Sequence, residues 1–285
     1  EKMASKFLLS TLATGAAASK ILILGDSMGE FTCGSEDSPG TNHFKETCKG
    51  SSVINKAAAG TTAYQWRVGG DQEASEAFAA AGSGVTHVWL SVGGNDFQSP
   101  AEGGGGPGSD SAPCKMSTAN LSSRMQSAID GVNAAAAANA MGSIKIIMTG
   151  YCVPMGAVLA EIGCTKDNMA TLTSAYTKMA ADNANVEFHD ISAQCQQKAE
   201  YFISDCLHLN AKGYCKSLSL STVQTAFGCG EKTYDCATVK STACDGKEST
   251  SAVGNDGGSG RNLGHGMTWV TLGAAVSATM MALAL

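Results

Sequence analysis

The sequence predicts an α/β protein: a three-layer sandwich whose central, mostly parallel sheet of five strands is covered by helices on both faces. Three observations predict it. Short apolar segments alternate with helical or loop stretches along the 285 residues, and such alternation is typical of parallel sheets joined by crossover helices. The apolar segments are nearly continuous, which indicates strands buried on both faces. The eleven cysteines indicate that disulfides stabilise the domain.

The expected elements follow in chain order, and together they describe a flavodoxin-like sandwich. Strands are expected at residues 21–24, 53–54, 85–92, 144–149 and 186–191. Helices are expected at residues 71–81, 118–141, 166–183 and 211–226. Residues 99–113 are too rich in Gly and Pro for regular structure and are expected to form a loop.

Both ends of the chain have the composition of processing signals. Residues 1–18 hold a lysine, an apolar run and small residues before Ala18, which predicts a signal peptide; an N-terminal helix or anchor is the alternative. Residues 256–285 end in an apolar tail behind a polar spacer, which predicts a GPI-anchor signal; an ordinary tail-anchored helix is the alternative. Asn255 is the preferred attachment site, with Gly257 or Gly258 as alternatives.

The domain organisation follows from these two ends. We expect a catalytic-type domain at residues 19–230 and a cysteine-containing extension with a Gly/Ser/Thr-rich stalk at residues 231–255. Such a protein would be secreted and held at the cell surface by its lipid anchor, its only membrane attachment, and we expect it to be a monomer. Asn120 begins the single glycosylation sequon of the chain.

The cysteines point to disulfides rather than to a metal. They form no C-x-x-C pair and no His cluster accompanies them, so we expect neither a metal nor another cofactor. Sequence does not fix which cysteines pair. A preference for short loops gives Cys33–Cys48, Cys152–Cys164, Cys195–Cys206, Cys215–Cys229 and Cys236–Cys244, with Cys114 left over.

The net charge and the distribution of basic residues argue against nucleic acid as a partner. The formal net charge is −6, and the basic residues are scattered. Without a stripe of Lys and Arg to neutralise phosphates, nucleic acid is excluded as a partner.

Small and polar residues follow the first three expected strands. Open parallel sheets hold their functional residues at the carboxyl ends of the strands, so these residues would lie along one edge. Each alone has a structural explanation, as a turn glycine or a helix cap. The three stretches are Gly25-Asp26-Ser27, Gly60-Thr61-Thr62 and Gly93-Gly94-Asn95-Asp96.

Near the end of the domain, Asp205 and His208 stand three residues apart. On one helical turn this spacing puts both side chains on the same face. A carboxylate beside an imidazole orients a general base and stabilises its protonated form. A surface Asp–His pair without function is the alternative. His189 is a weaker candidate, because it and Asp190 would point to opposite faces of a strand.

The order of these motifs resembles that of the SGNH hydrolases, also called the GDSL esterase/lipase family. The sequence G-D-S, a glycine after the second strand, G-G-N-D and D-x-x-H occur in that order over residues 20–228. Met28 stands where the family often has the leucine of its name.

The resemblance implies roles for five residues. Ser27 would be the nucleophile, His208 its general base and Asp205 the carboxylate that orients the imidazole. The backbone N–H groups of Ser27 and Gly60 and the side-chain amide of Asn95 would form the oxyanion hole. A disulfide from Cys206, to Cys195 or to Cys215, would hold the base in place.

The implied function is hydrolysis of carboxylic esters, with a small-molecule or glycan ester as substrate. Short acyl or carbohydrate acetyl groups are favoured over fatty esters, the alternative substrate, because residues 99–113 are too rich in glycine to form an apolar cover. Two alternatives remain: an O-acyltransferase with the same triad, and a non-catalytic surface binding module on the same fold. A phosphate or nucleotide binder is disfavoured, because the turn at residues 25–29 has no G-x-G-x-x-G or Walker spacing.

Overall fold

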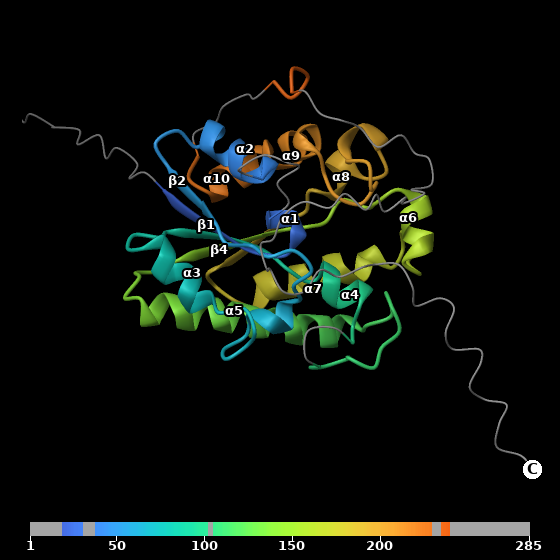
Figure 1. The fold of residues 1–285 in the computed structure, drawn as a ribbon, viewed down its shortest axis with the longest axis horizontal. Coiled ribbons are helices and arrows are strands. Elements are labelled where there is room, and N and C mark those ends of the chain that lie inside the picture. Colours follow the sequence, from blue (N-terminus) through green and yellow to red (C-terminus); the bar gives the residue numbers. More distant parts are fainter. Residues whose placement is uncertain (1–18, 31–37, 102–104, 230–234, 240–285) are drawn as a thin grey trace, which may run out of the picture. The chain divides into compact units, whose positions relative to one another are not determined.

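A sheet of five strands forms the centre of the fold, in the order β2-β1-β3-β4-β5 (Figure 1). The structure is a computed structural model and describes residues 19–30, 38–101, 105–229 and 235–239. Every neighbouring pair of strands is parallel, so the predicted parallel sandwich is confirmed. The strands are β1 (Lys20–Gly25), β2 (Ser52–Asn55), β3 (His87–Ser91), β4 (Lys145–Thr149) and β5 (Val186–His189).

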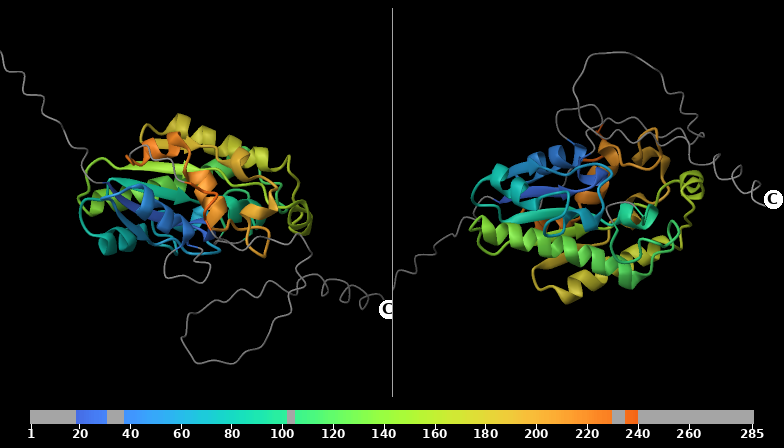
Figure 2. Two further views of the ribbon diagram at one scale, coloured as in Figure 1. Left: turned by 90° about the horizontal axis from the view of Figure 1, so that it is seen from above. Right: turned by 60° about the horizontal axis from the view of Figure 1, so that its bottom comes forward.

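Helices connect the strands and cover both faces of the sheet (Figures 1 and 2). None of those within the described ranges is long and apolar enough to cross a membrane. The α-helices are α1 (Ser27–Glu30), α2 (Pro39–Thr47), α3 (Ala74–Ala81), α4 (Gly94–Gln98), α5 (Thr118–Ala138), α6 (Gly156–Glu161), α7 (Met169–Asp182), α8 (Ser192–Cys195), α9 (Ala211–Leu218) and α10 (Ser221–Ala226). Two short 3-10 helices are η1 (Ala63–Trp66) and η2 (Ala199–Tyr201).

The short helices α1, α4, α6 and α8 were not expected, and two longer helical regions also differ from the expectation. The helix expected at residues 211–226 is two helices, because Leu220 has an extended backbone and the Gln224 side chain caps α9 by donating to the Leu218 carbonyl at 2.6 Å. Helix α2 was not predicted. It begins at a recognisable signal, since Ser38 accepts the N–H of Thr41 and Pro39 occupies the first turn.

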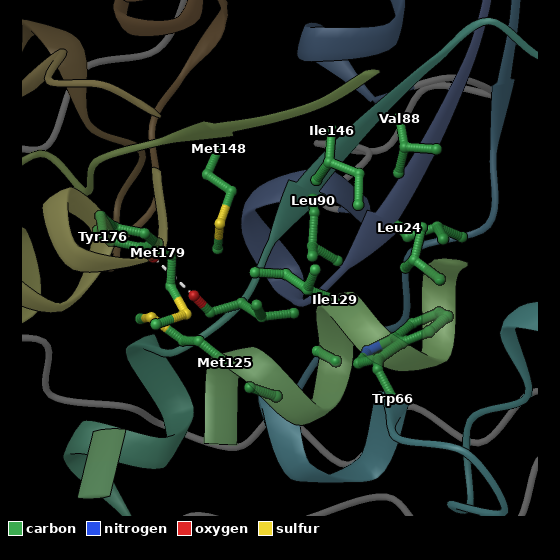
Figure 3. Close-up of a cluster of buried hydrophobic side chains, with 14 of the residues drawn as sticks. Leu24, Trp66, Val88, Leu90, Met125, Ile129, Ile146, Met148, Tyr176 and Met179 are labelled. Carbon is green, nitrogen blue, oxygen red and sulfur yellow. Dashed lines mark hydrogen bonds between the residues drawn. The ribbon is translucent and has the colours of Figure 1, made fainter. Parts of the chain in front are cut away.

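The alternation of side chains along β1 divides the core into two layers. Leu22 and Leu24 belong to a cluster with α3, α5 and α7 on one face (Figure 3), and Ile21 and Ile23 pack with α2, α9 and α10 on the other. All four side chains are fully buried. Burial on both faces explains why this strand is continuously apolar.

The strand order places a topological switch point at β1. The chain passes from β1 to β2 on one side and then crosses to β3 on the other. In open α/β sheets, ligands bind in the crevice at the carboxyl ends of the strands beside such a point. The turns that follow β1, β2 and β3 therefore define the expected position of a site.

The predicted disulfide pairings are wrong. The pairs Cys33–Cys48, Cys152–Cys164, Cys195–Cys206, Cys215–Cys229 and Cys236–Cys244 do not form, and Cys114, expected to be left over, is bonded. The structure instead has Cys48–Cys229, Cys114–Cys164, Cys152–Cys195 and Cys215–Cys236. Cys206 is also disulfide-bonded, whereas Cys33 and Cys244 lie outside the described residues.

The short-loop rule failed because packing, not sequence distance, decides which cysteines meet. Cys48 ends α2 and Cys229 follows α10, and both helices cover the same face of the sheet. Their thiols meet although 181 positions separate them in the sequence. Proximity of this kind depends on the whole topology and is invisible to a rule based on spacing.

Candidate active site

The turn after β1 presents Ser27 at the switch point. Gly25 ends the strand with a φ of +120°, and a side chain there would collide with the Ser91 carbonyl of β3, 1.8 Å from an ideal Cβ. The next N–H, of Asp26, donates to that same carbonyl at 2.7 Å. The chain then enters α1 with Ser27 as its first residue. Glycine is required here because two strands and a sharp turn meet.

Ser27, His208 and Asp205 form one hydrogen-bonded chain. The Nε2 atom of His208 lies 2.7 Å from Ser27 Oγ, and its Nδ1 atom lies 2.6 Å from Asp205 Oδ2. The structure thus brings together all three residues that the sequence pattern picked out, although 181 positions separate the serine from the histidine.

The turn that carries Asp205 and His208 is rigid. Asp205 Oδ1 accepts the backbone N–H groups of Leu207 and His208, both at 2.9 Å. The His208 carbonyl in turn accepts the N–H of Ile203 at 2.9 Å. Cys206, in the same turn, has a φ of +56° and is held by its disulfide, although neither Cys195 nor Cys215 is the partner. The imidazole is therefore fixed relative to its carboxylate.

The environment keeps Asp205 ionised. Burial by itself would raise the pKa of this carboxyl, but the hydrogen bond and charge of His208 and the two backbone N–H groups hold it below its usual range. An ionised Asp205 favours the His208 tautomer that carries its proton on Nδ1, so that Nε2 is the ring nitrogen able to accept a proton.

Gly60 and Asn95 lie on turns that are locked to the Ser27 turn. The Gly25 carbonyl accepts the N–H of Ala58 at 2.8 Å and the hydroxyl of Thr61 at 2.9 Å. The Thr61 carbonyl accepts one N–H of the Asn95 amide at 2.9 Å. These bonds join the ends of β1, β2 and β3 into one unit.

Each of these three turns keeps a donor available. The backbone N–H groups of Ser27 and Gly60 have no acceptor among the described residues. The side-chain amide of Asn95 has a second N–H besides the one bound to Thr61. Gly60 has a φ of +76° with open space where a side chain would start, so its backbone can be approached closely.

Three further residues of this region, Asp26, Tyr151 and Glu30, were given no role by the sequence pattern. Asp26 is fully buried, and its Oδ1 accepts the Met28 N–H at 3.0 Å and the Ser91 hydroxyl at 3.1 Å. The Tyr151 hydroxyl donates to its other oxygen, Oδ2. Glu30 accepts the N–H of Ala59, next to Gly60, at 2.7 Å. Tyr151 follows β4 almost directly, so the strand-end rule would have found it had we applied it to the fourth strand. Nothing in the sequence marks Glu30.

Metal ligation has no candidate in the part of the chain that the structure describes. No group of three or more His, Cys, Asp or Glu side chains there could hold a metal ion.

Comparisons with solved structures identify the fold. Among solved structures, an aryl esterase of M. smegmatis is similar at 14% identity and a TM-score of 0.52, over 74% of this chain and 100% of that one. A carbohydrate acetylesterase from Sinorhizobium meliloti is similar at 16% identity and a TM-score of 0.51, over 73% and 96%. At such identities the likeness shows the fold, which is that of the SGNH esterases. No curated protein matches the chain.

The family is established by the sequence itself. The family model of the GDSL-like lipases and acylhydrolases matches residues 23–215, well over half of the chain. The chain belongs to this family, and its function is that of an esterase or acylhydrolase.

Proposed function

We propose that this protein is a serine esterase that cleaves carboxylic esters through Ser27, His208 and Asp205. The observation that carries the proposal is the hydrogen-bonded chain from Asp205 through His208 to the Ser27 hydroxyl. A serine hydroxyl is a poor nucleophile until a base takes its proton. His208 Nε2 lies within hydrogen-bond distance of Ser27 Oγ, and the Nδ1–H tautomer favoured by Asp205 makes this nitrogen the acceptor.

The reaction would run in two stages. Ser27 Oγ bonds to the ester carbonyl carbon while His208 Nε2 takes its proton. The tetrahedral intermediate then collapses, and the imidazolium gives that proton to the departing alcohol, which leaves an acyl-serine. In the second stage a water loses a proton to the same imidazole and attacks the acyl carbon. The carboxylic acid leaves, and Ser27 regains its proton.

Negative charge develops on the carbonyl oxygen in both stages. The N–H groups of Ser27 and Gly60 and the second amide N–H of Asn95 are the donors we propose for it. Because hydrogen bonds between the turns hold these donors, they need no reorganisation as the charge forms.

Removal of one donor tests the proposed oxyanion hole. We expect Asn95→Ala to lower kcat for an aryl acetate by roughly 10²- to 10³-fold, with a small change in KM, because the lost bond strengthens in the transition state. Steady-state kinetics of folded variants check this. Gln98→Ala at the other end of α4 is the matched control and should keep its kcat. An Asn95→Ala enzyme with wild-type kcat would remove Asn95 from the oxyanion hole.

For the substrate we propose esters of short acyl groups, including acetylated carbohydrates. One of the similar folds carries the name carbohydrate acetylesterase, which supports a small acyl group. The test is a series of p-nitrophenyl esters from acetyl to decanoyl, together with acetylated glycans. We expect kcat/KM to fall as the acyl chain lengthens. A rise with chain length would favour fatty esters, and transfer of the acyl group to an added alcohol in place of water would identify an O-acyltransferase.

We also propose that the protein works outside the cell. The disulfides among the described residues support an oxidising compartment. The predicted signal peptide at residues 1–18, the anchor site Asn255 and the tail at residues 256–285 lie outside the described residues and stay predictions. Asn120 lies partly exposed in the first turn of α5, and its glycosylation also stays a prediction.

A further inference from the structure

A buried hydroxyl connects two turns of the proposed site. The Tyr151 hydroxyl donates to the Asp26 carboxylate and accepts the N–H of Gly94 at 3.3 Å. Asp26 precedes Ser27, and Gly94 precedes Asn95. One oxygen atom therefore bridges the turn of the proposed nucleophile and the turn of a proposed oxyanion donor.

The tyrosine is held so that its hydroxyl has little freedom. Its ring stacks on Tyr176, which stacks in turn on Phe188 with centroids 5.1 Å apart. The Tyr176 hydroxyl donates to the Val92 carbonyl at 2.6 Å. A Cβ on Gly94 would lie 2.8 Å from the Tyr151 ring, so the ring and the Gly94 backbone are in direct contact. The ring stacking and the contact with Gly94 thus both hold the Tyr151 hydroxyl in place.

We propose that Tyr151 is a positioning residue: through Asp26 and Gly94 it fixes Ser27 and Asn95 relative to one another, provided that Asp26 is ionised. The inference rests on the proposed function. An ionised Asp26 only accepts, and it takes bonds from Met28, Ser91 and Tyr151. Protonation turns one of its oxygens into a donor, which is incompatible with keeping every one of these bonds.

This arrangement makes activity depend on pH in a particular direction. Burial raises the pKa of Asp26 to about 6, while the hydrogen bond from Tyr151, the bonds from Met28 and Ser91, and the charge of His208 act in the lowering direction. The titratable groups that face Asp26 are Tyr151, Tyr176 and His208. The bridge is complete above the Asp26 pKa and is lost as pH falls through it. Part of the decline of kcat at low pH, its acid limb, is therefore caused by protonation of Asp26.

Tyr151→Phe tests the proposal, because it removes only the bridging oxygen. We expect kcat on an aryl acetate to fall roughly 10- to 100-fold with KM little changed, since the two turns lose their alignment. We also expect the acid limb of kcat to move to higher pH by roughly one unit, because Asp26 loses a hydrogen bond that favours its charged form.

Two further variants separate positioning from a general loss of packing. Tyr176→Phe deletes a buried hydroxyl that lies beside Tyr151 but donates to the Val92 carbonyl. It should lower the thermal midpoint and move the acid limb of kcat less than Tyr151→Phe does. Ser91→Ala removes a different hydrogen bond to Asp26. It should move the acid limb of kcat to higher pH, with a smaller loss of kcat than Tyr151→Phe. If Tyr151→Phe does not fold, the limb of Ser91→Ala still tests the role of Asp26.

The outcomes are distinguishable. An inactive wild-type protein would contradict the proposed esterase function itself. An active wild type whose Tyr151→Phe variant keeps both kcat and the acid limb would overturn the positioning role. Equal losses of kcat in Tyr151→Phe and Tyr176→Phe, without a shift of the limb, would overturn it as well.

Discussion

Ser27→Ala is expected to lower kcat/KM for ester hydrolysis by roughly 10⁴- to 10⁶-fold, because it removes the atom that would bond to the acyl carbon. The variant should fold normally. Ser27 is the first residue of α1, and its hydroxyl donates to Nε2 of the half-buried His208 rather than to a buried backbone group. Initial rates on an aryl acetate measure the loss of activity, and a thermal unfolding scan measures whether the variant folds normally.

A matched serine provides the control. Ser174 lies exposed in α7, and its hydroxyl donates to the Ala170 carbonyl one turn earlier. Ser174→Ala should therefore keep the wild-type rate. If Ser27→Ala retained more than about a tenth of the activity, the rate would have to come from another group.

Asp96→Ala is expected to cause the largest loss of stability, roughly 3–5 kcal/mol in the free energy of unfolding. The guanidinium of Arg124 is fully buried and lies 3.3 Å from Asp96 Oδ1. Its other N–H groups donate to the carbonyls of Pro100 and Pro107, both at 2.8 Å. An arginine cannot give up its proton, so the variant leaves a positive charge buried without its counter-ion. The N–H of Ala63 also loses its acceptor, 2.6 Å away.

Urea unfolding of two further variants measures how much of this loss comes from the unpaired charge of Arg124. Arg124→Met should be milder than Asp96→Ala, because burial raises the pKa of Asp96 and the carboxyl can take up a proton once its partner is gone. The double variant should recover part of the loss, since no unpaired charge remains. A loss below about 1 kcal/mol for Asp96→Ala would contradict this account of the buried pair.

Local sequence features predicted the sheet and the candidate triad well. The apolar segments are long enough to identify the strands, because burial on both faces leaves them continuously apolar. Asp205 and His208 are close in sequence, so a local spacing reveals their pairing. Their meeting with Ser27 follows from the topology, since the crevice lies where the chain changes direction across the sheet.

Contacts between distant elements could not be read from the sequence. Every disulfide pairing was wrong, because helices such as α2 and α10 meet only after the sheet has formed. The break between α9 and α10 depends on a side-chain cap by Gln224, which no periodicity reveals. The bridge through Tyr151 joins residues 125 positions apart. The tyrosine has no motif of its own, and only its place just after the fourth strand could have indicated it.

The central claim is that Ser27 is an activated nucleophile, and covalent labelling tests it most directly. The folded, disulfide-intact protein would be treated with a fluorophosphonate probe, and the modified peptide identified by mass spectrometry. We expect one label, on Ser27, that disappears in Ser27→Ala and is strongly slowed in His208→Ala, since the base is lost. Absence of labelling in the folded protein, or a label that persists in Ser27→Ala, would contradict the claim.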